Sequence, residues 1–337
     1  YLTGKLTTEL SIFRPHVLIL GAGASLQAFP NGDRHGRRVP LMDSIVEVVG
    51  LEPILLEAGC RYSDRNFEEL YSNLHSAGEL ETLRLIEDRI RQYFSSLELP
   101  DQPTLYDHLV LSLRKKDLIA TFNWDPFLSL ALKRNRLRAI MPRAAFLHGN
   151  VSIGYCENHR QMGPRDSRCP KCHVYYTDSE LLYPVSQKDY TKYPFLKVQW
   201  DALQRCLQSA YVLTVFGYSA PTSDIEACRL MKEAWGPALS RSYEETEFID
   251  IQSEEQLRAT WSDFIHTHHS STHQSFYDSH IAKHPRRTCE ATWASTMENE
   301  SLDDRDIPRN AEWDELTQWY KPLVSAELVA EANKQGS

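Results

Sequence analysis

A buried-strand pattern that runs directly into a glycine turn constrains the fold of this chain more than any other feature. Residues 16–20 read HVLIL, a continuous apolar run typical of a parallel strand covered on both faces. The run ends at the turn Gly21-Ala22-Gly23-Ala24-Ser25. A strand followed by Gly-x-Gly and a helix is typical of nucleotide-binding α/β folds, although a purely structural turn would use the same residues.

Three more strand patterns follow along the chain, at residues 117–122 (DLIATF), 211–216 (YVLTVF) and 248–251 (FIDI). Loops and helical patterns alternate with them, and Asp224 is expected to cap one of the helices. Residues 41–116 instead show apolar positions at helical spacing. The sequence therefore predicts an α/β fold, a Rossmann-like parallel sheet with a helical insertion over 41–116.

A cysteine- and histidine-bearing segment over residues 151–176 has the ligand spacing of a zinc-ribbon-like module. Two pairs of ligands, each with two intervening residues, are separated by nine residues. Such pairs supply four ligands to one tetrahedral Zn²⁺, which would be structural because no position is left for catalysis. His173 could replace the first histidine, and reduced, unliganded thiols are the alternative. The predicted ligands are Cys156, His159, Cys169 and Cys172.

Composition and charge exclude several classes of protein. The net charge of −9 disfavours broad, direct nucleic-acid binding, which needs a basic face. No apolar run reaches the roughly 18–20 residues of a membrane span, and no signal-peptide pattern is present, so we expect a cytoplasmic protein without membrane contact. Tyr1 in place of an initiator Met suggests that an N-terminal tail precedes this sequence.

The C-terminal part is expected to differ from the rest. We predict a main domain over residues 10–260 and an extension over 261–337 that serves packing or assembly. The stretch 266–284 contains six of the 13 histidines among Ser and Thr, and we expect a solvated loop there. The helical insertion and a terminal amphipathic helix offer more apolar faces than one sheet can cover, which predicts a homo-oligomer.

The motifs occur in a specific order: the glycine turn, Asn123-Trp124-Asp125, His148-Gly149, the Cys/His segment, and Gly217-Tyr218-Ser219. This order resembles the SIR2 (sirtuin-like) family, in which such motifs form an NAD pocket between a Rossmann-like domain and a smaller module. The resemblance covers residues 17–251. It implies NAD as a substrate, bound by Gly21, Ala22, Gly23, Ser25, Asn123, Asp125, Gly217, Tyr218, Ser219 and Asp250.

The resemblance also implies individual catalytic roles. Asn123 would orient water and the ribose, Asp125 would lie beside the nicotinamide carboxamide, and His148 would be the general base. Cleavage of an N-glycosidic bond builds oxocarbenium-like charge on the sugar, and it needs hydrogen-bond acceptors and a base that titrates near neutral pH. Taken singly, Asn123 and Asp125 could be caps at a strand end, and His148 an ordinary loop histidine.

The chain departs from the deacylase branch of that family. The Gly-Ile-Pro-x-Phe-Arg stretch is missing, and Phe122 stands where the deacylases have Gln. These departures resemble bacterial SIR2-like effectors of antiphage defence, which degrade NAD. The resemblance implies an NAD nucleosidase that releases nicotinamide and ADP-ribose. Alternatives are an NAD-dependent protein deacylase and a catalytically silent NAD or nucleotide sensor. Because the chain has no Walker loop of its own, family analogy suggests a HerA-type ATPase as partner.

Overall fold

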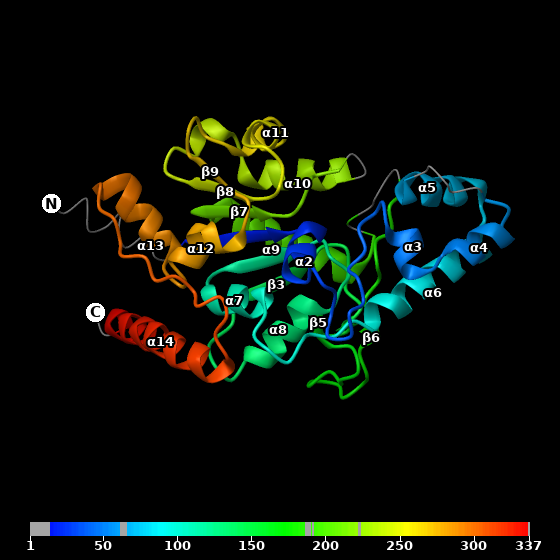
Figure 1. Cartoon of the computed structure of the whole chain (residues 1–337), viewed down its shortest axis with the longest axis horizontal. Coiled ribbons are helices and arrows are strands. Elements are labelled where there is room, and N and C mark those ends of the chain that lie inside the picture. The colour runs from blue at the N-terminus through cyan, green and yellow to red at the C-terminus, as the bar shows by residue number, and fades with distance from the viewer. Residues whose placement is uncertain (1–13, 61–65, 186–189, 191, 222–223, 336–337) are drawn as a thin grey trace.

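The computed structural model describes residues 14–60, 66–185, 190, 192–221 and 224–335. Its centre is a parallel sheet of six strands in the order β3-β2-β1-β7-β8-β9 (Figure 1). Numbered along the chain, these strands lie in the order 3-2-1-4-5-6, which is the Rossmann arrangement. The strands are β1 (His16–Leu20), β2 (Leu118–Thr121), β3 (Arg143–Phe146), β7 (Val212–Phe216), β8 (Glu245–Ile249) and β9 (Ser270–His273).

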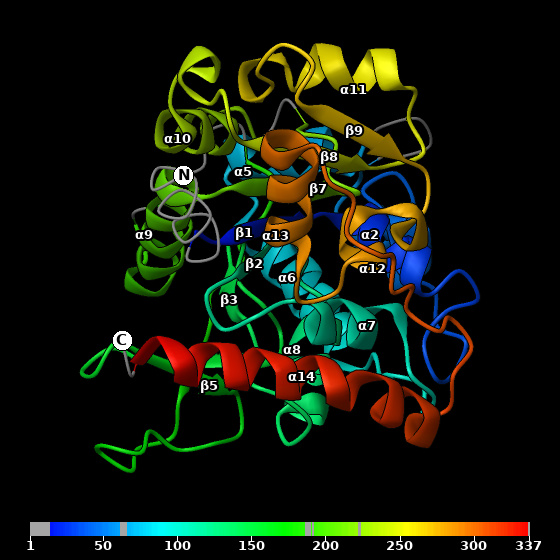
Figure 2. The same cartoon turned by 90° about the vertical axis from the view of Figure 1, so that its left-hand side faces the viewer.

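The predicted fold class is confirmed, because both the parallel sheet and its buried strands are present. Every residue of β1, β2 and β7 is buried, as their uninterrupted apolar patterns predicted. Helices cover both faces of the sheet (Figure 2). One face carries α9 (Pro194–Ser209), α10 (Ile225–Trp235) and α11 (Glu254–Thr260), and the other carries α2 (Ala22–Ala28), α7 (Leu105–Ser112), α8 (Phe127–Asn135), α12 (His280–Lys283) and α13 (Thr288–Trp293).

Four helices between α2 and α7 form a lobe at one end of the molecule (Figure 1). Their apolar positions at three- and four-residue spacing are buried, including Leu83, Ile86, Ile90 and Phe94. This part of the chain is helical, as its periodicity predicted. The helices are α3 (Ile45–Val49), α4 (Glu52–Glu57), α5 (Phe67–Ala77) and α6 (Leu80–Ser95).

A second, antiparallel sheet of three strands carries the Cys/His segment. It consists of β4 (Ile153–Cys156), β5 (Gln161–Pro164) and β6 (Thr177–Asp178), in the order β5-β4-β6. The segment is therefore a small β module attached to the main sheet after β3.

The prediction of a solvated loop over residues 266–284 was wrong. This stretch contains β9, which pairs in parallel with β8, and α12. The strand was missed because its sequence, Ser-Ser-Thr-His, has no apolar residue, and an edge strand can be held by its backbone hydrogen bonds alone. The main sheet consequently continues past residue 260, where the extension was expected to begin.

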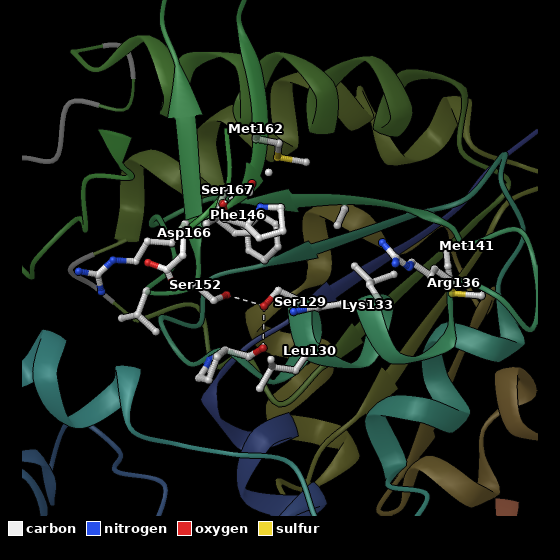
Figure 3. A pocket seen from close by; sticks show the side chains of 18 of the residues that line it. Ser129, Leu130, Lys133, Arg136, Met141, Phe146, Ser152, Met162, Asp166 and Ser167 are labelled. Atoms are coloured by element: carbon white, nitrogen blue, oxygen red, sulfur yellow. Dashed lines mark hydrogen bonds between the residues drawn. The ribbon is translucent and has the colours of Figure 1, made fainter. Parts of the chain in front are cut away.

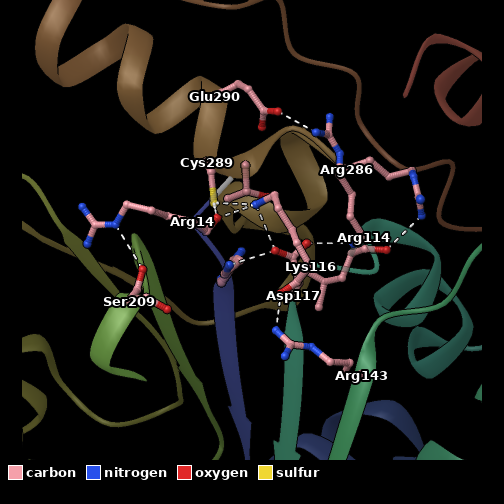
Figure 4. A network of polar contacts seen from close by, with 12 residues as sticks. Arg14, Arg114, Lys116, Asp117, Arg143, Ser209, Arg286, Cys289 and Glu290 are labelled. Carbon is pink, nitrogen blue, oxygen red and sulfur yellow. Dashed lines mark hydrogen bonds and ion pairs between the residues drawn. The ribbon is translucent and has the colours of Figure 1, made fainter. Parts of the chain in front are cut away.

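A network of polar contacts at the amino ends of β1 and β2 ties the C-terminal helices to the sheet (Figure 4). Lys116 Nζ donates to the Arg14 carbonyl (2.7 Å), to Asp117 Oδ1 (3.1 Å) and to Cys289 Sγ (3.4 Å) in α13. Burial alone would raise the pKa of Asp117, but the neighbouring Lys116 ammonium holds that pKa below its ordinary value. Arg286 adds an ion pair to Glu327 of the terminal helix α14 (Trp313–Gln335).

No helix in the described part of the chain is both long enough and apolar enough to cross a membrane.

Candidate active site

A cavity of about 510 Å³ lies where loops meet at the carboxyl ends of the parallel strands. The turns after β1 and β7 form its base, between the two strands where the strand order changes direction, which is where Rossmann folds bind ligands. Side chains from α5 and α6 also line it. The cavity brings together these predicted site residues: Gly21, Ala22, Gly23, Asn123, Asp125, His148, Gly217, Tyr218, Ser219 and Asp250.

The glycines at the base of the cavity allow two backbone turns to touch. Gly23 N–H donates to the Gly217 carbonyl at 2.9 Å, and a Cβ on Gly23 would lie 2.8 Å from Gly217 Cα. A Cβ on Gly21 would lie 2.3 Å from the Gly217 oxygen, and Gly217 itself has a φ of +61°. The absence of a side chain on Gly23 therefore allows its backbone to approach the turn after β7.

Asn123 is held in a fixed orientation just after β2. Its Nδ2 donates to the Gly21 carbonyl at 2.9 Å and to Ser25 Oγ at 3.0 Å. Because a carbonyl oxygen can only accept, the nitrogen end of the amide must face Gly21. The oxygen Oδ1 is then the polar atom left for a ligand. Asn123 is only 8% exposed, so it presents a pre-oriented acceptor in a largely dry site.

Asp125 is a buried carboxyl group in the lining of the same cavity. Its Oδ2 accepts from Ser25 Oγ at 2.7 Å, and its Oδ1 accepts from the Phe127 N–H at 3.2 Å. Burial raises the pKa of Asp125 to about 6. Ser25 does not line the cavity; instead it connects Asp125 to Asn123, and Tyr106 Oη lies 2.7 Å from its hydroxyl oxygen.

His148, which follows β3, lies beside the carboxylate of Asp224, a residue that the sequence predicted only as a helix cap. Its Nε2 is 3.6 Å from Asp224 Oδ1 and 3.4 Å from the Tyr190 hydroxyl. Asp224 occupies the N-cap position of α10, as predicted, but its side chain makes no hydrogen bond to that helix. The Asp224 carboxylate accepts from Tyr218 Oη at 3.0 Å instead. The contact between Asp224 and His148 joins residues 76 positions apart, and no local pattern signals it.

Aromatic rings hold this histidine in place. Phe122 meets the His148 ring edge-on, with centroids 4.8 Å apart, and the Tyr190 ring lies parallel to it at 5.8 Å. Tyr218 stacks on Phe122, with centroids 4.1 Å apart. Phe122, which stands where the deacylases have Gln, is the packing surface that orients His148 and Tyr218.

The four predicted metal ligands converge at one point in the β4-β5-β6 module. Their ligand atoms all lie within 4.8 Å of one another. Cys156 Sγ is 3.6 Å from His159 Nδ1 and 3.7 Å from Cys172 Sγ. Tetrahedral zinc requires about 3.6 Å between sulfur and nitrogen ligands and about 3.8 Å between two sulfurs. The residues therefore fit a structural zinc ion held by Cys156, His159, Cys169 and Cys172, with His159 rather than His173 as the fourth ligand.

A larger cavity, about 1080 Å³, lies beside α8 and the edge strand β3 (Figure 3). Its walls are mostly apolar and include Leu130, Met141 and Phe146, while the hydroxyls of Ser129 and Ser152 hydrogen-bond to each other there. None of the predicted catalytic, cofactor-binding or metal residues lines it. Chemistry-bearing side chains converge in the smaller cavity, which we therefore take as the candidate active site.

Comparison with known proteins adds weak likenesses only. No protein-family model matches the chain, and no curated protein matches it. Among solved structures, a complex of a Sir2 homologue with NAD is 14% identical over 86% of this chain and 94% of that chain, with a TM-score of 0.42. A Sir2 protein bound to a propionylated peptide is 14% identical over 86% and 98% of the two chains, with a TM-score of 0.37. The assignment of the fold rests on the strand order itself.

Proposed function

We propose that the chain binds NAD in the 510 Å³ cavity and hydrolyses the bond between nicotinamide and ribose. The supporting observation is that Asn123, Asp125 and His148, from the loops after two adjacent strands, line one cavity at the switch point of a Rossmann sheet. In the reaction, nicotinamide leaves with the electron pair of the C–N bond. Water supplies a hydroxyl to the ribose carbon, and its proton goes to a base. The products are nicotinamide and ADP-ribose.

Asn123 suits the developing positive charge on the ribose. Its amide nitrogen is already committed to Gly21 and Ser25, so its oxygen can accept a hydrogen bond from the attacking water or a ribose hydroxyl without reorienting. This fixed orientation would lower the barrier by positioning the water rather than by binding the substrate more tightly.

His148 suits the role of proton acceptor. Asp224 lies 3.6 Å from its Nε2 and would stabilise the imidazolium that forms when water loses its proton. Asp224 would act through the histidine, as a positioning residue. Asp125 would accept a hydrogen bond from the nicotinamide carboxamide, and Ser25 holds its carboxyl group in place at 2.7 Å.

The test is nicotinamide release from NAD by the purified chain, measured with and without an acetyl-lysine peptide. Hydrolysis predicts release at the same rate in both samples. Release only in the presence of the peptide would replace the proposal with NAD-dependent deacylation. Binding of NAD without any release would replace it with a silent sensor.

We further propose that the enzyme works in an assembly, as an effector of antiphage defence with a HerA-type ATPase as partner. Apolar side chains of the helical lobe support an assembly, because Leu56 is 60% exposed and Leu80 is 63% exposed. Light scattering tests this proposal. A monomer of 38.9 kDa at high concentration, both alone and with the ATPase, would contradict it.

A further inference from the structure

Three side chains that could bind a metal converge near β8 and β9, at the opposite end of the strand order from β3, the strand that precedes the Cys/His module. Glu247 lies in the middle of β8, His273 ends β9, and His280 begins α12 (Figure 2). The strand register pairs Ile249 with His273, and Glu247 is two residues before Ile249, so Glu247 and His273 point to the same face. One carboxylate oxygen and one imidazole nitrogen from each histidine all lie within 4.8 Å of one another.

The carboxylate of Glu247 lacks the usual cationic partner. Its side chain is 0% exposed, and its ion-pair partner among the described residues is His273 rather than a lysine or arginine. Burying a carboxylate costs several kcal/mol unless a cation neutralises it. A cation is therefore expected here, either a protonated histidine or a bound metal ion.

Hydrogen bonds from the surroundings hold this carboxylate in place. Thr214 Oγ1 donates to Glu247 Oε2 at 2.8 Å, and the backbone N–H of His280 donates to Oε1 at 2.7 Å. The single hydroxyl hydrogen of Thr214 is used for the carboxylate, so its oxygen accepts from His16 Nε2 at 2.8 Å. A chain of donors that orients a ligand from behind is typical of metal sites in proteins.

The spacing of the ligand atoms also favours a metal over a simple ion pair. His273 Nε2 lies 3.4 Å from Glu247 Oε1, yet it has no hydrogen-bond partner among the described residues. Two ligands of one tetrahedral zinc ion, each about 2.0–2.1 Å from the metal, lie about 3.4 Å apart.

We propose that Glu247, His273 and His280 bind a divalent transition-metal ion, zinc being the best fit, at a site separate from the Cys/His module. Three protein ligands leave one position for water. Past His273, the Gln274 carbonyl accepts from Gln27 Nε2 of α2, and Gln27 Oε1 accepts from the Phe276 N–H. The ion would thus fix the segment between β9 and α12 against the helix that follows the glycine turn of the candidate active site.

Metal content of the full chain tests this site without reference to NAD. Protein supplied with zinc and then desalted should hold two equivalents, and a variant with both His273→Asn and His280→Gln should hold one. The matched control is His268→Asn, an exposed histidine of the same stretch, which should keep two. Equal zinc content in the double variant and the unchanged chain would overturn the proposal.

A cobalt titration of the chelator-treated, unsubstituted chain gives an answer that does not depend on the folding of a variant. Cobalt in the Cys/His module should produce the strong sulfur-to-metal charge-transfer bands of thiolate ligands. Cobalt bound by Glu247, His273 and His280 should produce only the weaker bands of nitrogen and oxygen ligands. The proposal predicts one equivalent of each kind. Saturation at one equivalent, with every spectral change carrying thiolate bands, would contradict it.

Discussion

The two ends of the central parallel sheet both bury polar side chains, but they use them differently. At the amino ends, Lys116 and Asp117 face each other at 3.1 Å, and the Lys116 ammonium has two further partners. At the carboxyl ends, the Asn123 amide is held through its nitrogen, and the Asp125 carboxyl is buried with hydrogen bonds but with no cationic partner among the described residues. The amino end is thus organised for stability, and the carboxyl end keeps groups available to a ligand at a cost in stability.

The largest expected effect comes from substituting residues at the carboxyl ends of the strands, and it is an effect on turnover. Asn123→Ala should reduce nicotinamide release by orders of magnitude while NAD binding is largely kept, because the water and ribose lose their orienting acceptor. His148→Ala should reduce release by about 10² to 10⁴-fold through loss of the base. Steady-state rates and calorimetric NAD affinity check both. Turnover at the parent rate in both variants would contradict the assignment.

A substitution at the amino ends of the strands should have the opposite outcome, in that stability is lost and turnover is kept. Asp117→Ala removes the carboxylate beside the half-buried Lys116 ammonium and should lower the free energy of unfolding by about 3–5 kcal/mol. Nicotinamide release per folded molecule should stay within about twofold of the parent rate, since no reacting group is touched. Urea unfolding and rates well below the melting temperature measure the two effects. A folded Asp117→Ala protein without turnover would contradict the idea that the amino ends of the strands serve stability alone.

The pH dependence of the free energy of unfolding should show the effect of one buried carboxyl group, that of Asp125, at the carboxyl ends of the strands. Folding raises the pKa of Asp125 from 3.8 to about 6, so the folded state binds more protons than the unfolded state between these values. The contribution of Asp125 to stability should therefore decline as the pH rises from about 4 to about 6, by about 3 kcal/mol in total. Asp125→Asn should lack this decline. Denaturant unfolding of both proteins across this range tests it, and parallel stability curves would refute it.

A smaller effect is expected where a residue acts only through His148. Asp224→Asn keeps an acceptor for the Tyr218 hydroxyl but removes the charge beside the histidine. We expect the rate of nicotinamide release to fall by about 10 to 100-fold, with the KM for NAD little changed. An unchanged rate, or a loss confined to KM, would show that Asp224 does not assist the histidine.

The smallest effect on turnover should come from the zinc module. Cys172→Ser should lose one equivalent of zinc and lower the melting temperature, because the module loses a ligand that links its strands. Turnover below that temperature should change by less than about threefold, since the metal ligands do not line the cavity. Metal analysis and rates check this prediction. A collapse of turnover without unfolding would give the metal a catalytic role.

Local patterns in the sequence predicted the parts of this molecule that depend on local physics. Runs such as HVLIL were sufficient for the buried strands, and the spacing of Cys156, His159, Cys169 and Cys172 was sufficient for a cluster that converges. The polar strand β9 was missed, because its place in the sheet is set by backbone pairing with β8. The approach of Asp224 to His148 was missed because only the folded sheet brings these loops together.

The most direct test of the central claim is the fate of the water oxygen. The purified chain is incubated with NAD in water labelled with heavy oxygen, without any peptide, and the products are analysed by mass spectrometry. A hydrolase using Asn123 and His148 at the carboxyl end of the sheet predicts free nicotinamide and ADP-ribose that carries one labelled oxygen, with the formation of both products slowed by orders of magnitude in the Asn123→Ala variant. Intact NAD after prolonged incubation, or equal labelling by that variant, would contradict the account.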